Sequence, residues 1–155
     1  MRSRDDNVPT GIAVDRALEY GVCGIGGRLE RPPASLSAAL TQTDAIFGER
    51  GARRLERFAS AAIGSFAWTR DGYELFWLCQ ISGEWRYDTD PGAWAVDLTH
   101  VRSCKWIPSP IPYDEVPASV HHSFARGGRN WQQIRAEDAS AATVRVWSHH
   151  RPGAA

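Results

Sequence analysis

Aromatic side chains concentrate in one stretch of the sequence, where their spacing suits stacking against a planar ligand. The stretch contains Phe66, Trp68, Tyr73, Phe76, Trp77, Trp85, Tyr87 and Trp94. Indoles near the ends of antiparallel strands can form a stacking pocket. We expect Trp85 and Trp94, which adjoin turns and charges, to line such a pocket, and Trp77 and Trp106 to belong to the core. A tryptophan-rich core is the alternative interpretation, and for Trp68 the two remain open.

A basic, glycine-rich loop is expected at residues 125–131. Its Arg126 and Arg129 are suited to phosphate contacts, and Asn130 is suited to a hydrogen bond with a base edge. The net charge is zero, yet residues 99–136 hold five cations against two acids. The alternative is a solvated turn between a helix and a strand. A stacking pocket beside a basic loop is typical of a protein that holds a flipped or unpaired base.

Catalytic and metal-binding signatures are absent from the sequence. None of the five histidines lies in a recognised nucleophile, zinc-protease or paired-carboxylate motif. The three cysteines, Cys23, Cys79 and Cys104, are widely spaced in apolar runs, so we expect small buried residues in a reducing compartment. A disulfide or a zinc site is not expected, nor is any cofactor. An enzyme that uses His100 with Asp97 or Asp88 remains a rival hypothesis.

The elements that must position these residues follow from periodicity and turn signals. Residues 1 to about 17 are expected to form a loose tail, 18–150 a single domain and 151–155 a frayed end. Expected strands cover 20–27, 65–70, 73–81, 84–88, 101–107 and 131–134. Expected helices begin at Ser35, with a stop or kink at Gly48, at Asp114 and near Glu137. This order predicts an α+β fold with a small, curved, barrel-like and mostly antiparallel sheet surrounded by peripheral helices.

The expected cellular compartment is inferred from the absence of two kinds of segment in the sequence. No apolar stretch is long enough to span a membrane, and no signal peptide is visible at the N-terminus. We therefore expect a cytoplasmic protein without a membrane partner.

Three sequence segments resemble the PUA-like superfamily, which includes the EVE, YTH and ASCH domains. They are Ile25-Gly26, the run from Leu78 to Tyr87, and the run from His100 to Trp106. Within that superfamily the pattern is most similar to the N-terminal module of bacterial modification-dependent restriction proteins. The resemblance covers about residues 21–135.

The resemblance implies a compact curved barrel whose aromatic cage holds a modified base flipped from DNA or RNA. Carried over by position, the cage would draw on the loop of Ile25, Gly26 and Gly27, on Trp68, and on Trp85 with Tyr87. Such modules often have an aromatic residue where this chain has Gly27, so that wall is either missing or supplied by Trp94. The restriction relatives carry a nuclease domain after the module, which implies a nuclease partner in trans for this chain.

The combined prediction is a non-catalytic nucleic-acid-binding module with a link to restriction or phage defence. Its expected backbone contacts are Arg86, Arg102, Arg126, Arg129 and Asn130. A small-molecule sensor that uses the same aromatic pocket is the main alternative. An interaction module with exposed tryptophan faces is a further one.

Overall fold

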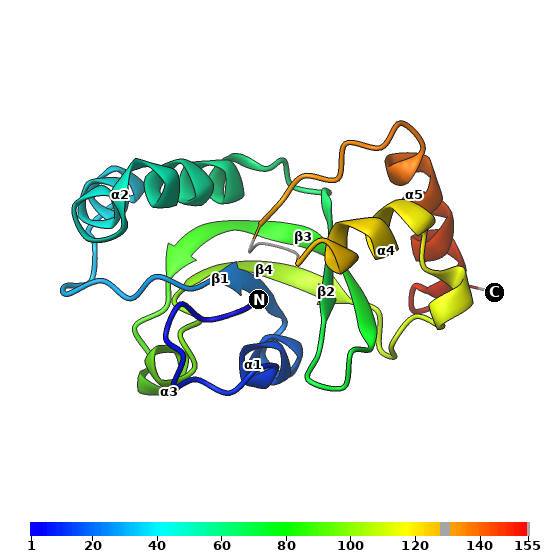
Figure 1. Cartoon of the computed structure of the whole chain (residues 1–155), viewed down its shortest axis with the longest axis horizontal. Coiled ribbons are helices and arrows are strands. Elements are labelled where there is room, and N and C mark those ends of the chain that lie inside the picture. The colour runs from blue at the N-terminus through cyan, green and yellow to red at the C-terminus, as the bar shows by residue number, and fades with distance from the viewer. Residues whose placement is uncertain (128–130, 155) are drawn as a thin grey trace.

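The centre of the protein is a four-stranded antiparallel sheet that curls into a half-barrel (Figure 1). The computed structural model describes residues 1–127 and 131–154. The strands are β1 (Val22–Ile25), β2 (Phe66–Arg70), β3 (Phe76–Tyr87) and β4 (His100–Trp106), in the spatial order β1-β4-β3-β2. The predicted α+β class, with a small curved antiparallel sheet and peripheral helices, is confirmed.

The longest strand departs from the sequence-based expectation. A turn was predicted at Ser82-Gly83, but β3 continues through it, and the pairing with β4 shifts between Ile81 and Trp85. The extra residues form a bulge, which bends a strand without ending it. Arg102 on β4 stabilises this bulge by donating from Nε to the carbonyl oxygen of Gly83 at 2.8 Å.

One long helix, α2 (Leu36–Ser60), covers one face of the sheet (Figure 1). The hydroxyl of Ser35 accepts a hydrogen bond from the backbone N–H of Ala38, which confirms the predicted N-cap. The predicted kink at Gly48 is also confirmed, because this residue has a φ of 81° inside the helix. Leu55 and Phe58 of this helix are buried against the sheet.

The other helices cover the opposite face and the β2 end of the sheet (Figure 1). They are α1 (Ile12–Tyr20), α3 (Pro91–Ala95), the single 3-10 turn η1 (Tyr113–Glu115), α4 (Ala118–Ala125) and α5 (Ala139–His150). No helix within residues 1–127 or 131–154 has the length and apolarity required to cross a bilayer.

The prediction of a loose N-terminal tail is wrong. Helix α1 occupies residues that were assigned to the tail; its Val14 and Ala17 are fully buried, and Ala17 packs in a cluster with residues of β1 and β4. Residues 1–11 also fold back on the domain, since Ser3 donates to the carboxylate of Asp97 at 2.7 Å. The segment is mostly polar, so its composition did not indicate that its few apolar side chains hold it against the domain.

Two further predictions near the C-terminus are wrong. Residues 131–134 form no strand; Trp131 and Ile134 instead pack against two different apolar clusters. The helix expected to begin at Asp114 begins after Pro117, which is the N-cap of α4. Proline disfavours helical geometry in the residue before it, so the extended Val116 separates η1 from α4.

Strand register assigns the aromatic residues to two faces. Trp68 lies opposite Leu78, whereas Trp85 lies opposite Arg102. Leu78 packs towards α4 and α5, while Trp85 and Tyr87 pack in the cluster that α2 covers. The candidate site therefore has to be sought separately on each face.

Candidate functional site

The cavity that best matches the predicted stacking pocket lies where β3 ends. It has a volume of about 190 Å³, and Tyr87 and Trp94 provide its aromatic lining. Leu29 and Pro32 add apolar lining. Two of the predicted pocket residues, from different elements, thus meet at one cavity.

Hydrogen bonds hold the side chain of Tyr87 and the backbone of Trp94. Tyr87 is the last residue of β3, and its hydroxyl accepts from the backbone N–H of Leu29 at 3.0 Å. Trp94 lies in α3, where its carbonyl oxygen accepts from Nε of Arg28 at 2.7 Å. The side chain of Trp94 nevertheless remains 47% exposed. The exposed indole of Trp94, beside the hydrogen-bonded phenol of Tyr87, leaves a flat surface available for contact with a ligand.

Helix α3 positions Trp94 through its N-terminal residues. The carboxylate of Asp90 accepts from the backbone N–H of Gly92 at 2.7 Å, and Pro91 occupies the first helical turn. Both features favour helix initiation at this point. The loop that was expected to hold Trp94 is therefore a short helix with a defined start.

Trp85, which was also predicted to line the pocket, does not line this cavity and instead stacks on a histidine. Its ring lies 6.1 Å from that of His100 at an interplanar angle of 25°, and its Nε1 donates to Nδ1 of His100 at 3.3 Å. Nε2 of His100 lies 3.0 Å from the carbonyl oxygen of Gly27. Because the indole N–H can only donate, Nδ1 must accept, and Nε2 carries the proton.

Burial keeps His100 neutral. Desolvation lowers the pKa of His100 to about 4, against the weaker opposing effects of the Gly27 carbonyl and the Asp97 carboxylate. The side chain is 1% exposed, and both ring nitrogens are hydrogen-bonded. The geometry thus gives no support to the hypothesis that His100 acts as a catalytic base with Asp97 or Asp88.

The glycine loop after β1 packs against Asp97 and does not line the cavity. Gly27 donates its N–H to the carboxylate of Asp97 at 2.9 Å, and a Cβ on Gly26 would lie 2.7 Å from the same carboxylate. Ile25 is buried in the core. None of these three predicted residues lines this cavity; the carbonyl of Gly27 instead accepts from His100, which packs against Tyr87 and Trp85.

Trp68 is not part of the pocket. It lies on the opposite face of the sheet from Trp85, and its Nε1 donates to the hydroxyl of Thr143 on α5 at 3.1 Å. The two residues thus join β2 to the last helix. The resemblance assigned Trp68 to the aromatic cage, and the structure corrects this assignment.

The predicted phosphate contacts fall into three groups. Arg102 is 1% exposed and donates to backbone carbonyl oxygens, so its assignment to the nucleic-acid surface is wrong. Arg86 and Arg126 are exposed. Arg129 and Asn130 lie outside the described residues.

The basic loop ends on the same side of the sheet as the aromatic wall. Trp131, the first described residue after the loop, packs edge-on against Phe58 of α2 with ring centroids 4.9 Å apart. It belongs to the same apolar cluster as Trp85 and Tyr87. The loop and the aromatic residues are therefore connected through one packed layer.

Acidic residues of the cavity were missed by the sequence interpretation. Glu30 and Asp88 both line it, and Asp88 also lies 3.5 Å from the guanidinium of Arg16. Their sequence signal was weak, because loop carboxylates are usually solvated. Here they provide hydrogen-bond acceptors beside the two aromatic rings.

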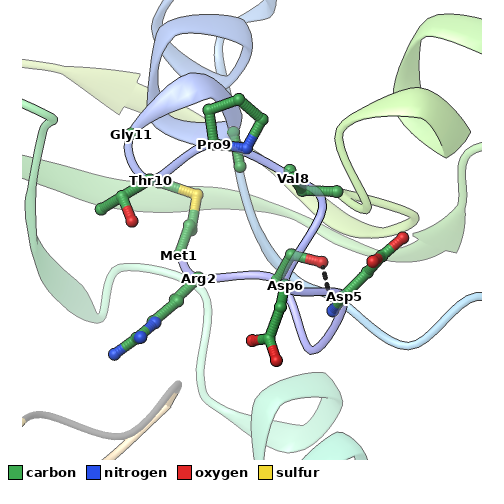
Figure 2. Close-up of a pocket in the computed structure, with 10 residues that line it drawn as sticks. Met1, Arg2, Asp5, Asp6, Val8, Pro9, Thr10 and Gly11 are labelled. Atoms are coloured by element: carbon green, nitrogen blue, oxygen red, sulfur yellow. Dashed lines mark hydrogen bonds between the residues drawn. The ribbon is translucent and has the colours of Figure 1, made fainter.

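A second cavity lies within the N-terminal segment and is much smaller. Figure 2 shows residues of this segment, between Met1 and Gly11, that line the cavity. Its volume is about 60 Å³. This volume suits ordered water better than a base.

Comparison with known proteins gives no relative: the chain matches no protein-family model, no curated protein and no solved structure.

Proposed function

We propose that this protein is a non-catalytic nucleic-acid-binding module that holds a modified or flipped base between Tyr87 and Trp94. The main observation that supports this proposal is the cavity of about 190 Å³ that these two side chains line at the end of β3. Aromatic walls stack on the face of any base, whatever its sequence context. The hydrogen bond that holds the Tyr87 side chain before a ligand arrives lowers the cost of ordering this wall on binding.

The polar lining supports a preference among bases. Carboxylates accept hydrogen bonds, and Glu30 and Asp88 are placed beside the rings. The exocyclic amino groups of adenine and cytosine donate hydrogen bonds, whereas the carbonyl groups of uracil and thymine only accept. We therefore propose that the favoured base carries an amino group on the edge that enters the cavity.

Backbone contacts in this proposal come from cations outside the cavity. Arg126 is exposed and borders the basic loop, and Trp131 anchors the end of that loop beside the aromatic layer. Arg86 is an additional exposed cation next to Tyr87 in sequence. A nuclease partner in trans and a link to restriction remain part of this proposal.

The deciding experiment uses Trp94→Ala and measures the anisotropy of labelled oligonucleotides, plain and carrying modified bases, single- and double-stranded. Loss of one stacking wall should cost about 1–3 kcal/mol, or a roughly 5- to 150-fold higher Kd for the preferred base. Weak binding to plain oligonucleotides should persist. Tyr73→Ala is the matched control, because Tyr73 is 88% exposed at the turn between β2 and β3.

A small-molecule sensor is the second candidate, and the acidic lining favours it. Glu30 and Asp88 repel phosphate, while they would attract an amine-bearing metabolite that stacks on Trp94. This alternative predicts no oligonucleotide binding by folded wild-type protein. It also predicts quenching of tryptophan fluorescence by aromatic amines that Trp94→Ala removes.

A further inference from the structure

Three cysteines from three strands meet in the core, away from the aromatic cavity. Cys23 lies on β1, Cys79 on β3 and Cys104 on β4, and their sulfur atoms all lie within 4.8 Å of one another. The side chains are 3%, 0% and 8% exposed, and none forms a disulfide. Their positions, distant in sequence, converge because the register of the sheet directs all three to the face under α2.

The spacing of the sulfur atoms is close to that of a three-coordinate metal site. Thiolate sulfur binds zinc at about 2.3 Å, which places three ligands of a trigonal ion about 4.0 Å apart. The sulfurs of this cluster need only small side-chain movements to reach that distance. Within the described residues, no histidine, aspartate or glutamate joins the group as a fourth ligand.

A buried positive charge lies beside this cluster. Arg102 is 1% exposed, and its guanidinium donates to carbonyl oxygens of Gly83 and Phe58. No ion pair among the described residues joins it to a carboxylate. Buried charges are stable when a partner of opposite sign compensates them.

We propose that Cys23, Cys79 and Cys104 form a site for one soft divalent metal ion of the zinc group, bound through three thiolates. Charge balance supports a divalent ion: three thiolates and one such ion carry a net charge of −1, which the guanidinium of Arg102 neutralises. A monovalent ion would leave a net negative charge in the core. Hard ions such as Mg²⁺ prefer oxygen ligands and are excluded by the donor set.

Binding is an exchange of the metal ion for protons. The ion forms three metal–sulfur bonds, and the thiol protons of Cys23, Cys79 and Cys104 leave to solvent. The three thiolates and the ion then carry a net charge of −1, which the guanidinium of Arg102 brings to zero.

The test measures metal stoichiometry on the whole protein by native mass spectrometry, with Zn²⁺, Cd²⁺ and Mg²⁺ as separate probes. The protein is refolded with each ion under a phosphine reductant, because the buried cluster is closed to fast exchange. We expect one Zn²⁺ or Cd²⁺ per chain, no Mg²⁺, and ultraviolet thiolate-to-metal charge transfer with Cd²⁺. If Cd²⁺ binds and Zn²⁺ does not, the site belongs to the heavier ions alone.

Cysteine variants and a second cluster provide the controls. Cys79→Ala and Cys104→Ala should weaken binding at least as much as the roughly 10- to 100-fold that loss of an outer-shell partner costs. Glu115, His149 and His150 form an exposed group that could also hold an ion. The paired change His149→Ala with His150→Ala should therefore leave the charge-transfer band intact.

Two results would overturn the proposal. One is a folded, reduced wild-type protein, verified by circular dichroism, that takes up neither Zn²⁺ nor Cd²⁺ on refolding. The other is binding that persists in folded Cys79→Ala and disappears in the histidine variant. Neither result bears on nucleic-acid binding, since none of the three cysteines lines the cavity of Tyr87 and Trp94.

Discussion

At the residue scale, His100 illustrates how a polar side chain becomes part of the core. Its neutral ring connects Trp85 to Gly27 and is hydrogen-bonded at both nitrogens. Because its pKa falls from 6.5 to about 4 on folding, the unfolded chain binds a proton that the folded chain rejects. The resulting stability is fully present above pH 6.5 and is lost as the pH falls to 4, by up to about 3 kcal/mol.

This effect is measurable as the pH dependence of the free energy of unfolding. Urea titrations of wild type and His100→Gln between pH 7 and pH 4 should differ in slope, since glutamine does not titrate. Wild type should lose the additional stability between pH 6.5 and pH 4. Parallel profiles for the two proteins would show that His100 does not titrate differently on folding.

At the element scale, the end of α2 depends on Arg102. Its Nη1 donates to the carbonyl oxygens of Phe58 and Ala59 at 3.0 and 3.4 Å, and also to that of Ala61. These oxygens lie in the last turn of the helix and just after it, where intrahelical donors are lacking. One β4 side chain thus fixes both the helix end and the β3 bulge.

Removal of this arginine should therefore destabilise the fold strongly. Arg102→Met leaves several buried carbonyl oxygens without a donor, and we expect a loss of about 3 kcal/mol or more in the free energy of unfolding. Arg86→Met on the paired strand is the matched control, because Arg86 is exposed; its effect should stay within about 0.5 kcal/mol. Equal losses in the two variants would contradict the assigned role of Arg102.

At the scale of the whole molecule, the parts predictable from sequence are those set by local pattern. The Ser35 cap, the Gly48 kink and the strands of the sheet follow from periodicity and turn residues. The bulge at Ser82-Gly83 does not, because it depends on Arg102, 19 residues away. The burial of α1 and the separation of Trp68 from Trp85 likewise depend on register and packing across the sheet.

The candidate site was predictable only in part for the same reason. Tyr87 and Trp94 meet at one cavity, as expected, whereas Ile25, Gly26 and Gly27 support the wall from behind. The convergence of the cysteines was invisible in their wide spacing. Contacts between distant segments decide which polar and aromatic residues remain accessible to a ligand. Those contacts cannot be read from the local pattern of a single sequence.

Net charge bears on the whole molecule's affinity for nucleic acid. With equal numbers of acidic and basic residues, the chain has no excess of positive charge to attract phosphate, and Arg102 is buried. The logarithm of the binding constant should fall with the logarithm of salt concentration with a slope of about −0.7 per contact for single strands and −0.9 for duplexes. Nucleic-acid binding by this protein should therefore have a shallow salt dependence, and base stacking should provide most of its selectivity.

Arg126→Gln tests this division of roles. It should reduce the salt slope by about one contact's share and weaken binding to preferred and plain oligonucleotides equally, because a phosphate contact carries no base information. Trp94→Ala should leave the slope unchanged and remove the preference. Anisotropy titrations at several salt concentrations separate the two effects. If Arg126→Gln changed the preference while the slope stayed constant, the cation would be reading the base, and the assignment of phosphate contact to this loop would be wrong.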